Sequence, residues 1–285
     1  MPKAAALPSR RNHRPKLGQH FLADPRAAAE IVAALGDISE RTVLEIGPGR
    51  GVLTTMLAKS AHRLIAIELD RVLAAQLRMQ FAQSRNVEII EGDALAVDFD
   101  TVFGPRPGST HTGAELTLEP VRVVGNIPYY ITSELLLRLF EYRTYLESMV
   151  LMVQSEVADR LSAKPGSRDY GLLSATAQLF TQVEKLFTLP PASFSPPPKV
   201  HSAVVRFMFQ SRLEQLRVPE RPFVDFLKLS FAQKRKTLWN NLKLQYGPET
   251  LRRALEQAQV KPTVRAEAMS LESSAALFRA LAEAR

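Results

Sequence analysis

The sequence predicts an α/β fold in which a parallel, doubly wound sheet is followed by a smaller all-helical C-terminal domain. Over residues 24–209, short β-branched runs alternate with helical stretches. The glycine-rich turn Gly47–Gly51 joins the first of these strands to a helix. From about Gln210 onward the apolar residues keep a helical spacing, without a strand pattern. We therefore expect a basic arm over 1–23, a Rossmann-like domain over 24–209 and a helical domain over 210–285.

The elements are placed by the residues that begin and end them. Asp24 and Pro25 are typical of the start of a helix, which should end near Gly36. The expected strands are 42–46, 63–68, 87–90, 121–125, 148–153, 183–188 and 201–209. The expected helices that follow them are 52–59, 70–81, 133–141, 156–162 and 172–181, and those of the helical domain are 223–232, 235–244, 249–257 and 271–284. Residues 103–120, rich in Pro, Gly and Thr, are interpreted as a surface loop or insertion.

Composition excludes several classes of site. The 285 residues contain no cysteine, which excludes disulfides, thiolate metal sites and a cysteine nucleophile. No apolar run approaches the roughly 20 residues that a membrane span needs, and the N-terminus lacks the apolar core of a secretory signal. We expect a globular cytoplasmic protein, a monomer by default, and no metal site.

The net charge of +8 is distributed unevenly. The arm carries five bases and no acid, among them Arg10, Arg11 and Arg14, whereas residues 24–209 have a net charge of −3 and residues 210–285 one of +6. This distribution fits a nearly neutral body flanked by two surfaces that attract a polyanion. Solubilising surface charge is the alternative. An organelle transit peptide is disfavoured because three prolines interrupt the arm.

The loop after the first strand favours a site for a cationic nucleoside. The pattern is Glu45-x-Gly47-x-Gly49-x-Gly51, and Glu68 ends the next strand 21 residues after Gly47. A glycine-rich turn lets the backbone approach a ligand, and an acid about 20 residues further on can accept from ribose hydroxyls. A dinucleotide oxidoreductase normally has Gly-x-Gly-x-x-Gly facing a pyrophosphate. The spacing here instead resembles that of methyltransferases that use S-adenosylmethionine, which carries an ammonium and a sulfonium.

Asp93 ends the third strand in the run Glu91–Ala94. Its carboxylate can accept from an adenine amine, while Ala94 leaves room for the ring; the alternative is a turn-capping Asp. Because the carboxyl ends of parallel strands share one edge, Asp93 should lie beside Gly47 and Glu68, which favours the ligand role.

The segment Gly125–Tyr130 follows the fourth strand at the same edge. The Asn126 oxygen and the neighbouring Ile127 carbonyl can accept both hydrogens of an exocyclic amine, Pro128 fixes the local φ, and Tyr129 can stack on a flat base. The alternative is a strand followed by a Pro turn and a Tyr in the core. The position beside the cofactor site favours the base-holding interpretation, and Tyr130 is expected to be structural.

The order of motifs closely resembles the ribosomal RNA adenine N6-dimethyltransferase family over nearly the whole chain. The motifs are Gly18–Leu22, Glu45–Gly51, Glu68–Asp70, Glu91–Ala94, Asn126–Tyr130 and Phe194–Ser202. The length and the run Phe231–Leu238 look most like the bacterial branch that dimethylates two adjacent adenosines near the 3′ end of 16S ribosomal RNA. The resemblance implies S-adenosylmethionine as cofactor, contacted by His20, Leu22, Gly47, Glu68, Asp93 and Asn126.

The resemblance also suggests a mechanism. The N6 lone pair is delocalised into the adenine ring until the hydrogens are held out of plane. We expect Asn126 and the Ile127 carbonyl to accept these hydrogens, so that catalysis comes from positioning and electrostatics. Tyr129 would stack on the flipped base, with Phe194 as candidate for its other face, although both rings could equally be core.

The basic ends are expected to dock RNA within an immature small ribosomal subunit. The candidate contacts are Arg10, Arg11, Arg14, Lys234, Arg235, Lys236 and Lys243, the last four placed on predicted helices. A solvated helix face is the alternative. Three rival functions stay open: a methylase of a single adenosine in large-subunit RNA, a non-enzymatic nucleic-acid-binding relative, and a dehydrogenase.

Overall fold

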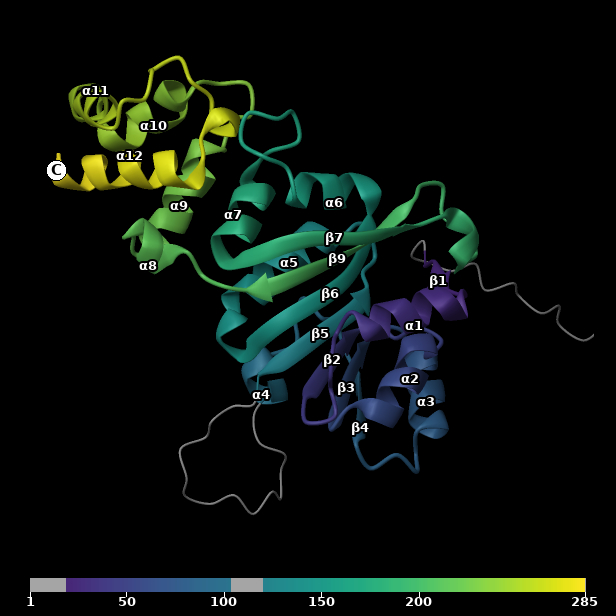
Figure 1. Cartoon of the computed structure of the whole chain (residues 1–285). Coiled ribbons are helices and arrows are strands. Elements are labelled where there is room, and N and C mark those ends of the chain that lie inside the picture. Colours follow the sequence, from purple (N-terminus) through teal and green to yellow (C-terminus); the bar gives the residue numbers. More distant parts are fainter. Residues whose placement is uncertain (1–18, 104–119, 285) are drawn as a thin grey trace, which may run out of the picture.

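A seven-stranded sheet forms the centre of the computed structural model, which describes residues 19–103 and 120–284 (Figure 1). The strand order is β4-β3-β2-β5-β6-β9-β7. The strands are β2 (Thr42–Ile46), β3 (Arg63–Glu68), β4 (Val87–Glu91), β5 (Val121–Asn126), β6 (Leu146–Gln154), β7 (Thr181–Leu189) and β9 (Ser202–Phe209). The expected α/β fold is confirmed. The predicted arm and the predicted loop at 103–120 lie largely outside the described residues.

The sheet is parallel from β4 to β6, as predicted, and it is mixed at the other edge, where the closing strands were expected without a stated orientation. There β9 runs antiparallel to both β6 and β7. The reason is the connection: β7 and β9 are joined by a short proline-rich segment and not by a crossover helix, so the chain returns in the opposite direction. The chain runs outward from β2 to β4 and then places β5 on the other side of β2. This reversal makes the adjoining carboxyl ends of β2 and β5 the point where such sheets bind ligands.

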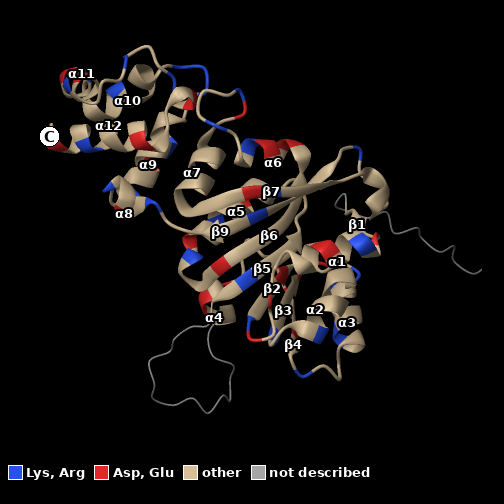
Figure 2. Cartoon of the chain, in the orientation of Figure 1, with Lys and Arg blue, Asp and Glu red and all other residues tan. Residues whose placement is uncertain are grey.

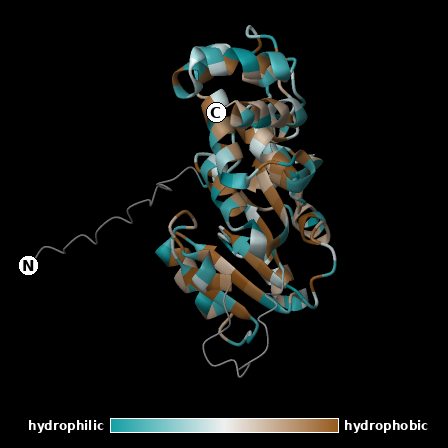
Figure 3. Ribbon diagram, turned by 90° about the vertical axis from the view of Figure 1, so that its left-hand side faces the viewer, coloured by the Kyte–Doolittle hydropathy of each residue, from teal (hydrophilic) through white to brown (hydrophobic). Residues whose placement is uncertain are grey.

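Helices cover both faces of the sheet. The helices α1 (Pro25–Ala33) and α2 (Val52–Ser60) pack on one face, with α3 (Arg71–Gln80) beside them, and α5 (Thr132–Glu141), α6 (Ser155–Leu161) and α7 (Leu172–Phe180) pack on the other (Figure 1). The inner strands β2, β3, β5, β6 and β9 are therefore largely buried on both sides, whereas the edge strands β4 and β7 are partly exposed, and hydrophobic residues concentrate on the sheet in Figure 3. The predicted start at Asp24 is confirmed, because its carboxylate caps α1 by accepting from the Arg26 N–H at 2.9 Å.

A second, two-stranded sheet was not predicted. In it β1 (Phe21–Leu22) pairs antiparallel with β8 (Phe194–Ser195), so that Phe21 faces Ser195 and Leu22 faces Phe194. The short helices α4 (Phe99–Phe103), η1 (Arg143–Tyr145), η2 (Pro191–Ser193) and η3 (Ala266–Ala268) were also missed. The pairing joins segments more than 170 residues apart, so no local pattern indicates it. Its consequence is that the segment before α1 is held across the sheet edge.

All regular elements after Phe209 are helical. They are α8 (Leu213–Leu216), α9 (Glu220–Ser230), α10 (Leu238–Tyr246), α11 (Pro248–Gln257) and α12 (Leu271–Glu283). One apolar cluster runs from the sheet into these helices, and Figure 2 shows basic residues dispersed over them. The boundary at 209/210 stays a prediction. Among the described helices, none is long and apolar enough to cross a membrane.

The predicted helix at 235–244 begins later, at Leu238. Thr237 is its N-cap, with its hydroxyl accepting from the Asn240 N–H at 3.4 Å. Threonine favours the cap over a helix interior because its hydroxyl can bond a free backbone N–H. Lys234, Arg235 and Lys236 therefore lie in a loop, and their assignment to a helix is wrong.

Candidate functional site

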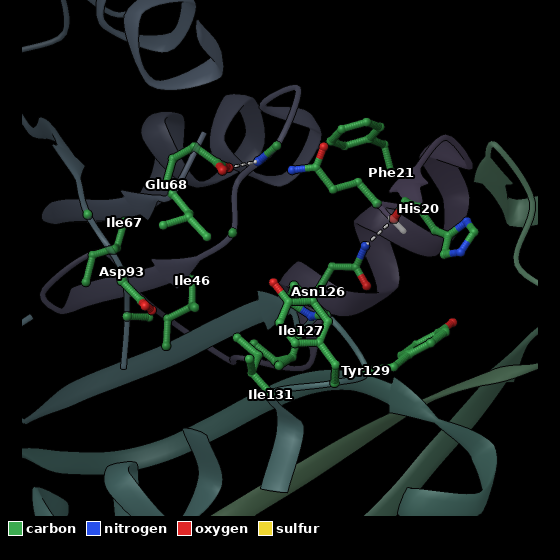
Figure 4. Close-up of a pocket in the computed structure, with 18 residues that line it drawn as sticks. His20, Phe21, Ile46, Ile67, Glu68, Asp93, Asn126, Ile127, Tyr129 and Ile131 are labelled. Atoms are coloured by element: carbon green, nitrogen blue, oxygen red, sulfur yellow. Dashed lines mark hydrogen bonds between the residues drawn. The ribbon is translucent and has the colours of Figure 1, made fainter. Parts of the chain in front are cut away.

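A cleft of about 830 Å³, including the open space at its mouth, lies at the carboxyl ends of β2 to β5 (Figure 4). The cleft is lined by residues 19–21, 46, 47, 49, 67–69, 92–94 and 126–131. Of the residues predicted from the sequence, it brings together His20, Gly47, Glu68, Asp93, Asn126, Ile127 and Tyr129.

The glycine turn forms the floor of the cleft and requires its glycines. Gly47, Gly49 and Gly51 have φ values of +69°, +58° and +79°, which side chains rarely adopt. A Cβ on Gly49 would lie 2.7 Å from Cδ1 of Phe21. The turn is therefore pressed against β1, and backbone groups rather than side chains face a ligand.

Glu68 fixes this turn to the end of β3. Its side chain is buried, with Oε2 accepting from the Gly49 N–H and Oε1 from the Asp70 N–H, both at 2.9 Å (Figure 4). Burial raises the pKa of Glu68, and the two backbone hydrogen bonds partly offset that shift. Each carboxylate oxygen has a second lone pair, so Glu68 can still accept from a hydroxyl group.

Asp93 fits both interpretations made from the sequence, a turn-capping residue and a carboxylate that faces a ligand. Its Oδ1 accepts from the Leu95 N–H at 2.9 Å, as a turn-capping Asp does. The residue is nevertheless exposed and lines the cleft beside the buried Ala94. No described residue donates to its Oδ2, which leaves one oxygen for an amine.

Asn126 is the last residue of β5, and its side-chain amide presents Nδ2 on one side and Oδ1 on the other. Its Nδ2 donates to the His20 carbonyl at 2.7 Å (Figure 4). A carbonyl can only accept, so this contact fixes the nitrogen on the His20 side and the oxygen on the other. Within the described ranges Oδ1 has no donor, and it is available for an amine hydrogen.

Tyr129 is anchored next to this amide. Its hydroxyl is 2.9 Å from the Ser202 hydroxyl, and its ring is 6.2 Å from the His20 ring, at 30° to it. Before it, Ile127 is buried and donates its N–H to the Met152 carbonyl at 3.2 Å. Tyr130 is 60% exposed and also lines the cleft, so the expectation that it is structural is wrong.

Leu22 and Phe194, both predicted as site residues, do not line this cleft, although Leu22 lines a small cavity that adjoins it at Phe21 and Gly47. They are 6% and 4% exposed and lie in the apolar cluster beneath α1 and α2. Side chains alternate along a strand, so when Phe21 faces the cleft, Leu22 and its partner Phe194 face the core. Phe194 is therefore placed as a core residue and not beside the target base.

His20 contributes mainly its backbone. Its carbonyl is taken by Asn126, and its ring Nδ1 is 2.8 Å from the Pro196 carbonyl, which turns the ring toward the β8 segment. The sequence reasoning missed Phe21, Ile46, Ile67 and Leu69 as lining residues. Their positions next to the predicted polar residues at each strand end were the available signal. No group of three or more His, Asp or Glu suited to a metal occurs within 19–103 and 120–284.

Comparison with known proteins gives consistent matches over the whole length. The family described as "Ribosomal RNA adenine dimethylase" matches residues 10–283. The chain is 55% identical to ribosomal RNA small subunit methyltransferase A of Koribacter versatilis, with 99% of both chains covered. It is 53% identical to the protein of the same name from Acidobacterium capsulatum, with 94% of this chain and 91% of that one covered.

Solved structures share the fold. A dimethyladenosine transferase from Plasmodium falciparum superimposes with a TM-score of 0.73 at 24% identity, covering 93% of this chain and 98% of that chain. The 23S rRNA methyltransferase ErmE superimposes with a TM-score of 0.64 at 25% identity, covering 92% and 99%.

Proposed function

The chain belongs to the ribosomal RNA adenine dimethylase family and is an S-adenosylmethionine-dependent methyltransferase, and we propose how its residues carry out that reaction. The reaction transfers methyl groups to N6 of two adjacent adenosines near the 3′ end of 16S ribosomal RNA, dimethylating each. Relatives named for the small subunit, at 55% and 53% identity, support this substrate over large-subunit RNA.

The cofactor is proposed to occupy the part of the cleft between the glycine turn and Asp93. When bound, it supplies a sulfonium-activated methyl group, and its sulfur keeps the electron pair of the broken C–S bond. Gly47 would approach the methionine part, Glu68 would accept from the ribose, and Asp93 would accept from the adenine amine. Two features support this fit: Gly47 and Gly49 line the cleft without a side chain that would fill it, and no described residue uses the second Asp93 oxygen.

Asn126 carries the catalytic proposal. Its Oδ1 and the Ile127 carbonyl accept the two N6 hydrogens, which localises the nitrogen lone pair and aims it at the methyl group. The bond from Nδ2 to the His20 carbonyl holds the amide before the substrate arrives, so orientation costs little at the moment of reaction. The N6 proton leaves to solvent without a strong base, because the nitrogen becomes acidic once it is methylated.

Tyr129 is proposed to stack on the flipped adenine. Its hydroxyl bond to Ser202 and its contact with the His20 ring fix the ring plane. A base that stacks on an aromatic side chain gains about 1–3 kcal/mol, which offsets part of the unstacking from the RNA.

RNA docking is proposed for the loop before α10. Lys234, Arg235 and Lys236 are exposed, and none forms an ion pair with another described residue. Lys243 on α10 is half-buried and donates to Asn240. The predicted contacts Arg10, Arg11 and Arg14 lie outside the described residues. We propose a monomer that acts in the cytoplasm on an immature small subunit.

The deciding experiment uses Asn126→Ala with labelled cofactor and immature small subunits from a strain that lacks the enzyme. We expect a loss of methyl transfer of about 100-fold or more, the magnitude seen when one oriented hydrogen-bonding group is removed. Calorimetry should show retained cofactor binding, and circular dichroism an intact fold. Wild-type transfer by the variant would contradict the assignment, and mapping the methylated nucleotide would exclude large-subunit RNA. Absence of cofactor binding by the wild-type chain would favour a non-enzymatic relative.

A further inference from the structure

Two buried carboxyl groups lie beside the glycine turn, and neither forms an ion pair within the described part of the chain. Glu45, inside β2, is 1% exposed, and Glu68, at the end of β3, is 4% exposed. The one base that lines the adjoining cavity is Arg50, which is exposed and lies with its guanidinium 4.8 Å from the centre of the Phe21 ring. Buried charges are usually paired, and Arg50 forms an ion pair with neither acid, so the two acids point to a positive group supplied by a ligand.

The oxygens of the two carboxyl groups differ in how many hydrogen-bond partners they have. Both oxygens of Glu68 accept backbone N–H groups. By contrast, Oε2 of Glu45 and the neighbouring hydroxyl of Thr54 are buried, and neither forms a hydrogen bond of good geometry with a described residue, so the contact between them is weak. Burial raises the pKa of Glu45 to about 8; Thr54 partly offsets the shift and the nearby Glu68 adds to it. Without a ligand, Glu45 is therefore mainly protonated at pH 7.

Among residues 19–103 and 120–284, the surroundings of Glu45 contain no titratable group other than Glu68 and Arg50. Glu68 faces it from β3 and Arg50 from the turn, whereas α2 and β5 contribute Thr54 and Asn126, which carry no charge. The small cavity that Glu45 lines shares Phe21, Gly47, Gly49 and Asn126 with the large cleft. Glu45 is thus next to the glycine turn, where a ligand with cationic groups would lie.

We propose that Glu45 is the counter-charge for the cationic groups of the cofactor and gives up its proton when the cofactor binds. The inference rests on the proposed function, which places S-adenosylmethionine in the cleft. The ammonium and sulfonium of this ligand outnumber its one carboxylate, so binding brings a net positive charge to a site with two buried acids. A nearby positive charge favours the ionised carboxylate and lowers its pKa.

The consequence is a proton count that can be measured. A carboxyl group with a pKa of about 8 is about 90% protonated at pH 7, so full ionisation on binding releases about 0.9 proton per cofactor. The affinity for the cofactor should then rise several-fold per unit between pH 6 and pH 7. Glu45 is in this sense a positioning residue, since it acts on the cofactor's charge and not on the adenine.

The test is calorimetry of S-adenosylmethionine binding to the full chain at pH 7, in two buffers with different enthalpies of protonation. The comparison is between the wild type and Glu45→Gln, which keeps the shape and removes the charge. We expect the wild type to release about 0.5–0.9 proton more than the variant. The cofactor's own amine titrates near the usual α-amino value of about 7.7–8.0 and contributes equally to both proteins, so the difference isolates Glu45.

Thr54→Val is the matched control, because it alters the same cavity and keeps the acid; it should release protons as the wild type does. Equal proton counts for the wild type and Glu45→Gln would overturn the inference while leaving cofactor binding intact. If Glu45→Gln does not fold, the wild-type affinity decides: an affinity that stays constant between pH 6 and pH 7 would overturn the inference as well. Failure of the wild type to bind cofactor would instead contradict the proposed function.

Discussion

Replacing Glu45 with Gln should make the stability of the cofactor-free protein less dependent on pH. The pKa of this carboxyl is about 8 in the folded chain and 4.5 as the reference for the unfolded chain. Between these values the folded state holds a proton that the unfolded state has lost. The stabilisation is therefore complete below pH 4.5 and is lost as the pH rises through 8.

The expected magnitude follows from the window between the two pKa values. Each pH unit well inside it changes the free energy of unfolding by about 1.4 kcal/mol, so Glu45 alone removes roughly 2–3 kcal/mol between pH 5 and pH 7. Gln carries no charge at any of these pH values. The stability of the variant relative to the wild type should thus increase by roughly 2–3 kcal/mol across this interval, a large part of the roughly 5–15 kcal/mol that a protein has in total.

The assay is urea unfolding of the wild type and of Glu45→Gln at pH 5, 6 and 7. The difference between their free energies of unfolding is taken at each pH, so that the contributions of the other titrating groups cancel. Glu256→Gln, an exposed position on α11, serves as the control and should change stability by less than about 0.5 kcal/mol at each pH. If the difference in free energy of unfolding between the wild type and Glu45→Gln stays constant from pH 5 to pH 7, the reasoning is refuted. The pKa of the Glu45 carboxyl would then be the same in the folded and the unfolded chain.

Three further predictions concern the rest of the site. Tyr129→Ala should lower kcat/KM about 5- to 150-fold, since about 1–3 kcal/mol of stacking is lost. Tyr129→Phe should keep most of the activity, because it loses only the hydroxyl bond to Ser202. Steady-state kinetics with subunit RNA distinguishes these two variants. Gly125→Ala should destabilise the protein by about 1–3 kcal/mol, because its Cβ would lie 2.5 Å from the Ile46 carbonyl oxygen, while Gly171→Ala, with open space around it, should be tolerated in the same unfolding assay. A triple variant in which Lys234, Arg235 and Lys236 are each replaced by Ala should reduce the slope of log RNA affinity against log salt concentration by about 2–3, while the cofactor affinity stays unchanged. An unaltered slope in a filter-binding titration would show that these residues do not contact phosphate.

The sequence predicted those parts of the site that depend on strand ends. Gly47, Glu68, Asp93 and Asn126 each follow a recognisable strand, and parallel strands bring their carboxyl ends to one edge, so local patterns were enough to gather them. The pairing of β1 with β8 depends on residues far apart in the sequence, and that pairing decides that Phe21 faces the cleft while Leu22 and Phe194 face the core.

Tyr129 and Tyr130 illustrate a second limit. Two adjacent tyrosines in a turn have the same local propensity, and only the Ser202 hydroxyl on β9 distinguishes the anchored ring from the exposed one. The late start of α10 has a similar origin. The run 231–237 is compatible with a helix by composition, but the Thr237 cap and the turn from the Lys236 N–H to the Gln233 carbonyl favour a loop.

The amide at position 126 explains why a stronger acceptor would not serve there. A carboxylate would accept amine hydrogens more strongly, but it could not donate to the His20 carbonyl and would repel it. That donation ties the end of β5 to the residue before β1, and β1 in turn presses on Gly49 through the Phe21 ring. An additional negative charge would also lie close to Glu45 and Glu68, which already lack a cationic partner among the described residues. A neutral group that donates on one side and accepts on the other can join the cofactor segment to the target amine, and asparagine is the shortest side chain that carries its donor and its acceptor on two separate atoms.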